Sequence, residues 1–143
     1  MGAIQKVEMY VFYFDLSGFV ARYLSDGQST LDRLRDFQRQ ARAEFNFSRP
    51  HSFVATLYDN VWARVNIAQP GTPSLVLDFA GKVMRSAEVH GFPSFFGCIT
   101  RGWHDCDPDD RMVVAKESFE DLTELHLDMT SEPHVRAAMA EKW

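Results

Sequence analysis

Residues 7–15 read VEMYVFYFD, and residues 16–19 continue as LSGF. The nearly continuous apolar run, rich in Val, Tyr and Phe, is typical of a strand that is covered on both faces of a sheet. The LSGF segment ends this run, and the residues after it predict a short helix through Ala21 and Tyr23. We therefore expect a central first strand whose end turns directly into a helix.

Three further helices are predicted along the chain. Ser29 or Thr30 can cap the second helix. Its apolar positions follow helical spacing and are Leu31, Leu34, Phe37, Ala41 and Phe45. A third helix is expected within residues 73–91, because Pro73 is tolerated in a first turn and Gly91 can end the helix. The last helix is expected to begin at Glu132.

The remaining strands are predicted from short segments rich in β-branched and aromatic residues. Residues 52–67 predict a hairpin that turns at residues 58–60, and residues 94–103 and 112–114 predict two more strands. Residues 104–111, HDCDPDDR, are interpreted as an acidic, solvated turn. Helices and strands thus alternate around one hairpin, which predicts an α+β fold with helices packed on one face of a mainly antiparallel sheet.

Length and composition limit the classes of protein to which the chain can belong. Its 143 residues suit one domain, residues 1–143, and the 45% hydrophobic content supplies a core and excludes disorder. A net charge of −5 argues against nucleic acid as a partner. No apolar window suits a membrane span, and residues 1–9 do not resemble a signal peptide. Two cysteines, Cys98 and Cys106, fit a reduced cytoplasmic setting.

Two aspartates stand out because of where they fall in the predicted sheet. Asp15 ends the first strand, and Asp59 lies at the tip of the hairpin. If the first strand is central, its end lies beside the hairpin, and the two carboxylates face each other. Mg²⁺ is usually held by one or two carboxylates together with substrate phosphate, and amides at a helix start can hold phosphate oxygens. The two residues also fit a turn residue and a helix cap, so spacing alone leaves both interpretations open.

Four segments of the chain resemble the class III nucleotide cyclase catalytic domains. FDLSGF at residues 14–19 is similar to the F-x-D-[IL]-x-G-F signature that opens those domains. TLYD at residues 56–59 lies where the family has T-I-G-D or F-S-D. FGCITRG at residues 96–102 is similar to R-G-A-I-S-x-G, and SEPHVRAAMAE at residues 131–141 is similar to the helix G-x-A-L-x-x-A-Y-x-L-E. The segments follow the family's order and cover most of the chain.

The resemblance implies a ferredoxin-like domain that dimerises head to tail and cyclises a nucleoside triphosphate at the shared interface. Asp15 and Asp59 would be catalytic and would hold two Mg²⁺ or Mn²⁺ ions, with Leu16 at the same metal site. The residues that it implies for nucleotide binding are Leu16, Ser17, Gly18, Phe19, Ala55, Tyr58 and Arg101. Family domains usually continue past the helix that here precedes Trp143, so the chain is expected to be short at its C-terminus.

The chain departs from the family pattern at several basic positions. Phe96 stands where the family has an Arg that often contacts the triphosphate, and Arg136 and Ala140 stand where it has Asn and Arg. In a regular strand, Arg101 would lie on the face opposite Phe96, so it is no simple substitute. Ala55 replaces the Lys with which adenylate-specific members read the base, which argues against adenylate cyclase.

Small stand-alone bacterial cyclases without the purine-reading residues resemble the Pycsar anti-phage group, which makes cyclic UMP or cyclic CMP. This resemblance implies UTP or CTP as the substrate and an anti-phage signal as the product. An aromatic residue such as Tyr58 or Phe53 would fill the space that a purine needs. Tyr58 fits a cross-strand aromatic of the hairpin equally well.

Two alternatives to catalysis remain open. The missing basic residues favour a degenerate cyclase-like domain that binds nucleotide or only dimerises. A ferredoxin-like interaction module, in which Asp15 and Asp59 are merely structural, would also fit the predicted elements. A zinc site at His104 and Cys106 is not expected, because the four ligands of a structural site and their usual spacings are missing.

Overall fold

The computed structural model describes residues 5–47, 52–68, 70–106 and 132–141. Its strands are β1 (Gln5–Leu16), β2 (Phe53–Leu57), β3 (Asn60–Asn66) and β4 (Phe95–Cys106). Its helices are α1 (Phe19–Ser25), α2 (Gly27–Glu44), α3 (Thr72–Val89) and α4 (Glu132–Ala140). The predicted first strand, hairpin, long helices and last helix are therefore present, while the predicted strand at 112–114 lies outside the described residues.

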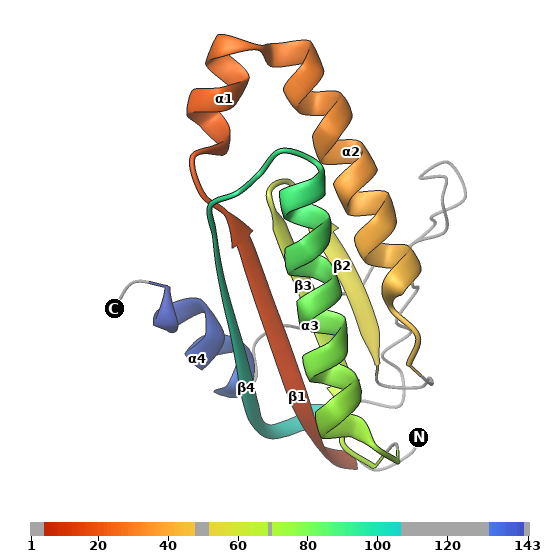
Figure 1. The fold of residues 1–143 in the computed structure, drawn as a ribbon. Helices are drawn as coiled ribbons and strands as arrows, with labels where there is room; N and C mark the ends of the chain where they lie inside the picture. The colour runs from red at the N-terminus through yellow and green to blue at the C-terminus, as the bar shows by residue number, and fades with distance from the viewer. Residues whose placement is uncertain (1–4, 48–51, 69, 107–131, 142–143) are drawn as a thin grey trace, which may run out of the picture.

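The four strands form one sheet in the order β2-β3-β1-β4, in which every neighbouring pair is antiparallel (Figure 1). β1 is central, as predicted, and pairs with β3 on one side and with β4 on the other. The order strand, helices, hairpin, helix, strand gives the ferredoxin-like arrangement. The predicted α+β fold with a mainly antiparallel sheet is thus confirmed.

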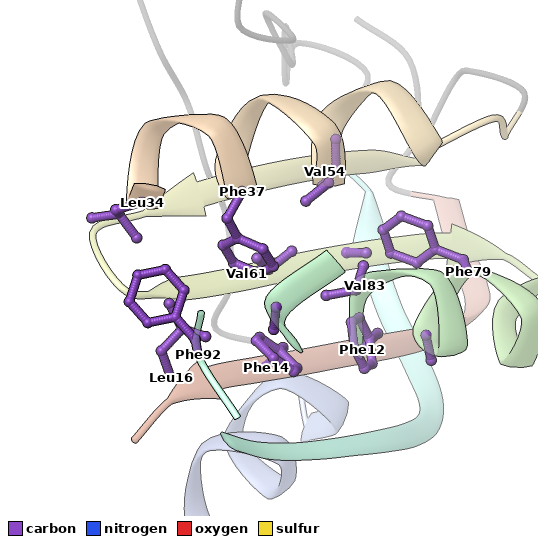
Figure 2. Packing of buried hydrophobic residues seen from close by; sticks show 14 of the residues in the cluster. Phe12, Phe14, Leu16, Leu34, Phe37, Val54, Val61, Phe79, Val83 and Phe92 are labelled. Atoms are coloured by element: carbon purple, nitrogen blue, oxygen red, sulfur yellow. The ribbon is translucent and has the colours of Figure 1, made fainter. Parts of the chain in front are cut away.

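The helices α2 and α3 cover one face of the sheet and enclose an apolar core (Figure 2). Strand residues alternate between faces, so Phe12, Phe14 and Leu16 all point toward these helices. The Phe12 ring meets Phe79 of α3 at 5.8 Å, and the Phe14 ring meets Phe37 of α2 at 5.7 Å. This face carries most of the buried apolar surface, and hence most of the stabilisation by the hydrophobic effect.

The helix α4 packs on the other face of the sheet, against β4 and β1 (Figure 1). There Ala137 joins Val7, Met9, Val11 and Tyr13 in a second apolar cluster. The prediction of helices on one face therefore holds for α2 and α3 but is wrong for α4. The apolar run of β1 explains the difference, because a strand that is apolar on both sides needs cover on both.

Two predicted local features differ from the structure. α2 begins at Gly27 after Asp26, so Ser29 and Thr30 lie inside the helix and do not cap it. The strand β4 continues to Cys106, so His104 is a buried strand residue and not part of a solvated turn. Its Nε2 lies 3.1 Å from the guanidinium of Arg64. The rest of the predicted acidic turn, residues 107–111, lies outside the described residues.

Among the described helices, none combines the length and the apolar character that are needed to cross a membrane.

Candidate functional site

Asp15 and Asp59 lie together at the end of the sheet where β1 finishes. Asp15 pairs across the sheet with Asn60, the first residue of β3, and Asp59 precedes Asn60 in the chain. The amide of Leu16 donates a hydrogen bond of 3.0 Å to the carbonyl oxygen of Asp59. This bond fixes the end of β1 to the hairpin turn, so the two carboxylates lie close together as predicted.

A third carboxylate, which was not predicted, reaches the same place from α4. The hydroxyl of Tyr13 donates a hydrogen bond of 2.5 Å to Oε2 of Glu141, directly after α4 ends. Burial, a hydrogen bond with Glu141 and the charge of Asp59 together raise the pKa of Asp15 to about 7. The proximity of the three acidic groups thus makes full ionisation costly at neutral pH.

The pKa values of the two aspartates depend on each other. Burial raises the pKa of Asp59 as well, but a backbone hydrogen bond and a hydrogen bond from Asp15 lower it again. The same bond between the carboxyl groups raises the pKa of Asp15. The two carboxyl groups therefore titrate as a coupled pair, and burial makes that pair harder to ionise fully than two exposed aspartates.

The Asn60 side chain lies between the two aspartates. With its amide nitrogen toward them, the orientation that satisfies the surrounding donors and acceptors, Nδ2 lies 2.5 Å from Oδ1 of Asp15 and 3.2 Å from Oδ1 of Asp59. An amide nitrogen carries two hydrogens, so it donates one hydrogen bond to each carboxylate. Asn60 therefore offsets part of the repulsion between them.

The LSGF turn lies beside the aspartates, and part of its backbone is already engaged. Gly18 adopts φ of 70°, which permits the tight turn from β1 into α1. The amide of Leu16 is bonded to Asp59, as described above, and the amide of Ser17 donates to the carbonyl of Ser94 at 3.0 Å. These two amides therefore hold the turn in place, and they are not available for the predicted phosphate contact.

Tyr58 is exposed directly beside Asp59 in the two-residue turn of the hairpin. Its φ of 59° is unusual for a residue other than glycine, and its side chain is 58% exposed. The Phe19 ring packs edge-to-face against it at 4.9 Å, and Nε2 of Gln38 donates to its carbonyl at 2.7 Å. The contact with Phe19 thus holds the ring of Tyr58, and the hydrogen bond from Gln38 holds its strained backbone.

The other residues predicted to contact a base lie in different surroundings. Phe53 is buried, with the guanidinium of Arg64 4.5 Å from its ring centre, so it cannot contact a base without a rearrangement. Ala55 is buried on β2, where it pairs with Trp62 on the same face as Asp15. The small side chain of Ala55 places no donor or charge there.

Among the described residues, the surface of the sheet next to the carboxylates is aromatic and carries none of the basic groups of the family pattern. Phe96 pairs directly with Asp15, and the ring of Tyr13 contacts Trp62 at 4.4 Å and Phe96 at 6.2 Å. Arg101 lies five residues further along β4, about 17 Å away, and binds Glu8 at 2.5 Å. The structure therefore does not bring Arg101 to the carboxylates.

The acidic pair has the chemistry of a site for a hard divalent cation. Mg²⁺ and Mn²⁺ prefer carboxylate oxygens, and a cation would relieve the repulsion that raises the two pKa values. Within the described residues, no group of three or more His, Cys, Asp or Glu side chains has the spacing of a complete metal site. Among the described residues, Asp15 and Asp59 can therefore supply two carboxylate ligands for such a cation.

The sequence predicts the place of the two aspartates, but the site also includes Asn60, Tyr13 and Glu141, which were not predicted. Asn60 could have been found, because a residue next to the hairpin Asp must face the end of β1 in an antiparallel pair. Glu141 had no comparable signal, since its position depends on the face of the sheet that α4 covers.

Comparisons with known proteins add little to this description of the site. No family model and no curated protein matches the sequence. The fold is similar to the X-ray structure of an EAL/GGDEF domain protein from M. capsulatus, with 16% identity and a TM-score of 0.46. The match covers 68% of this chain and 64% of that chain, so the chain spans less than two thirds of the solved protein. The fold assignment therefore rests on the strand order and register of the chain itself.

Proposed function

We propose that this chain is a nucleotidyl cyclase that converts a pyrimidine nucleoside triphosphate, UTP or CTP, into the 3′,5′-cyclic monophosphate and pyrophosphate. In this reaction the ribose 3′-oxygen forms a bond to the α-phosphorus, and the bond from that phosphorus to the pyrophosphate oxygen breaks. The proton of the 3′-hydroxyl is released to solvent. The substrate and the family are those implied by the four sequence segments, and the resemblance also suggests a signal in anti-phage defence.

The observation that carries this proposal is the pairing of Asp15 with Asp59 across the end of the sheet. The two residues come from separate sequence segments that each resemble a cyclase motif. Their carboxylates interact closely enough to shift each other's pKa, which is typical of groups arranged for catalysis or cation binding. Neither carboxylate is needed for the apolar core on the helical face.

Asp15 and Asp59 would hold Mg²⁺ or Mn²⁺, two ions in the family pattern. Bound there, the metal would lower the pKa of the ribose 3′-hydroxyl and neutralise charge on the triphosphate. The LSGF turn would orient the phosphates through the amides of Gly18 and Phe19, where Gly18 has open space in place of a side chain. The hydrogen bond from Leu16 to Asp59 keeps this turn and the hairpin in register.

Base selection in this proposal depends on Tyr58. Its exposed ring, supported by Phe19, offers a flat aromatic surface beside the phosphate-binding turn. A planar base can stack on an aromatic ring. Because the ring also occupies space, it favours the smaller pyrimidine over the larger purine. Ala55 supplies no hydrogen-bond donor of the kind that reads adenine in the family.

A second subunit is part of the proposal. In the family pattern the site lies at the interface of a homodimer, and the described part of this chain places few basic groups beside the carboxylates. Within the described residues, the surface near the site exposes large apolar side chains on α1 and the hairpin, namely Val20, Tyr23, Leu24, Leu57 and Tyr58. A partner subunit that covers this surface would add side chains to the site.

The proposal is tested by incubating purified protein with each of the four ribonucleoside triphosphates and Mn²⁺, followed by chromatography of the products. We expect a cyclic monophosphate from UTP or CTP, and none from protein with Asp15→Asn. If no triphosphate is consumed and Asp15→Asn leaves nucleotide binding unchanged, the proposal is wrong.

A degenerate, nucleotide-binding domain is the second candidate, and the position of Phe96 favours it. Phe96 pairs with Asp15, where a cyclase of the family pattern has an arginine. Without that charge, the chain would bind a nucleotide and metal but stabilise the leaving pyrophosphate poorly. Calorimetry with a non-hydrolysable UTP analogue separates the two candidates, because binding without turnover supports the degenerate domain.

A further inference from the structure

The Asn60 amide occupies the space between the two carboxylates that a cation would need. Its nitrogen lies 2.5 and 3.2 Å from one oxygen of Asp15 and one of Asp59, so these oxygens are no more than about 6 Å apart. A Mg²⁺ ion binds carboxylate oxygens at about 2.0 to 2.1 Å, so an ion shared by both residues needs this same space. The amide and the ion are therefore alternatives at this point.

The position of Asn60 beside the two carboxylates follows from the backbone of the hairpin and from the pairing of β3 with β1. Asn60 begins β3 directly after the hairpin turn, and it pairs with Asp15 in the antiparallel register. Cross-strand partners point to the same face of a sheet, so the two side chains lie side by side. The carbonyl oxygen of Asp59 accepts a hydrogen bond from the amide of Leu16, which keeps Asp59 at the end of β1.

We propose that Asn60 takes the place of the cation in the metal-free site. Its two hydrogen bonds hold the carboxylates together before metal binds and thereby determine the metal affinity of the site. This inference rests on the cation binding in the proposed function, but not on turnover. A hydrogen bond to a charged acceptor stabilises the metal-free state. A group that stabilises only the metal-free state must weaken metal binding by the same free energy.

The number of hydrogens that residue 60 can donate then determines the affinity. Asparagine donates two hydrogen bonds from its amide nitrogen, serine donates one and alanine donates none. Asn60→Ala should bind Mn²⁺ about tenfold more tightly than the wild type, with Asn60→Ser between them. A residue with only a structural role would instead loosen the site and weaken Mn²⁺ binding.

Asn66 provides the matched control. It lies at the other end of β3, on the same face of the sheet, and its Oδ1 accepts a hydrogen bond of 3.0 Å from the amide of Ala68. Asn66→Ala removes an asparagine from the same strand without touching the carboxylates. We expect it to change stability but to leave the affinity for Mn²⁺ unchanged.

The experiment is a titration of the four proteins with MnCl₂ alone at pH 8, followed by electron paramagnetic resonance of free Mn²⁺. Melting temperatures with and without saturating Mn²⁺ give a second readout. We expect Asn60→Ala to melt below the wild type without metal and to gain more from Mn²⁺. If Asn60→Ala does not fold, Asn60→Ser still decides the order of affinities.

The inference is overturned if Asn60→Ala and Asn60→Ser bind Mn²⁺ with the wild-type affinity or more weakly, or if none of the proteins binds Mn²⁺. Binding in the predicted order supports it even when no nucleoside triphosphate is turned over. In that case the proposed cyclase activity fails while the role of Asn60 stands.

Discussion

The two faces of the sheet differ in chemistry, although the same four strands form both. On the face under α2 and α3, β1 presents Phe12, Phe14 and Leu16 to an apolar core (Figure 2). On the opposite face the same strand presents Tyr13 and Asp15, next to Asn60 and the C-terminal end of α4. One face thus carries the larger apolar core, and the other combines a smaller apolar cluster with the groups that can bind ligand.

This difference shows how a short chain can hold like charges close together. Bringing carboxylates together costs free energy, and the cost is visible in the raised pKa of Asp15. The core on the helical face, with Phe14 and Phe37 in contact, supplies the stabilisation that offsets this cost. We therefore expect substitutions on the helical face to change stability, and substitutions on the acidic face, which carries Asp15 and Asn60, to change ligand binding and turnover.

The largest expected effect is on the acidic face. Asp59→Asn should lower turnover of the preferred triphosphate by more than about 1,000-fold, because it removes a charge that would hold the metal. The melting temperature should stay within a few degrees of the wild type. Product formation by chromatography and thermal unfolding check the two halves of this prediction.

Asp78→Asn is the control for that substitution. Asp78 lies on α3 and forms an exposed ion pair with Lys82 at 3.2 Å, so its loss should have little effect on either property. Equal losses of turnover in the two variants would contradict the assignment of the acidic face.

The next effect concerns the apolar face. Phe14→Ala should lower the free energy of unfolding by about 3 to 5 kcal/mol, because it leaves a cavity between Phe37 and Phe95. Denaturant titration measures this loss. The folded fraction should still bind Mn²⁺ with the wild-type affinity, and a large change in affinity would break the division between the faces.

Substitutions at Tyr58 should change nucleotide binding without a comparable change in stability. Tyr58→Gly should weaken binding of a UTP analogue about tenfold, because it removes the stacking surface. Stability should change by less than about 1 kcal/mol, since the relief of the positive φ offsets the lost contact with Phe19.

Tyr58→Phe keeps the ring and should bind the analogue within about twofold of the wild type. Calorimetry and thermal unfolding of both variants provide the data. A Tyr58→Gly protein with unchanged affinity would show that the ring serves only the hairpin.

The smallest expected effect is the dependence of stability on pH. Because the folded pKa of Asp15 is raised to about 7, its carboxyl stabilises the fold fully below the unfolded pKa near 4. That contribution is lost as the pH rises toward 7. We expect a loss of about 1 kcal/mol after solvent screening, and a smaller loss for Asp15→Asn, in which only Asp59 keeps a raised pKa. Melting temperatures between pH 4 and pH 8 measure the difference, and identical pH profiles would contradict it.

The sequence was most informative where one residue pattern determined one local structure. The apolar run of β1, the spacing of Leu34, Phe37 and Ala41, and the hairpin around Asp59 all appear as predicted. Because antiparallel neighbours in a short sheet follow from these elements, the approach of Asp15 to Asp59 was also predictable.

Features that depend on tertiary contacts were not predictable. The face that α4 covers depends on the surface that β1 leaves open, so neither Glu141 nor its bond to Tyr13 could be anticipated. The burial of His104 depends on the full length of β4, whereas its acidic neighbours in the sequence suggested a turn. The distance of Arg101 from the site follows from the strand register, which no local pattern determines.

The central claim is that Asp15 and Asp59 form a cation site that receives a nucleotide. Its most direct test is calorimetry of Mn²⁺ and a non-hydrolysable UTP analogue with the wild type and with the double variant Asp15→Asn, Asp59→Asn. We predict that the wild type binds the analogue only with Mn²⁺ present, and that the folded double variant binds neither. Equal binding of both ligands by the two proteins would contradict the claim.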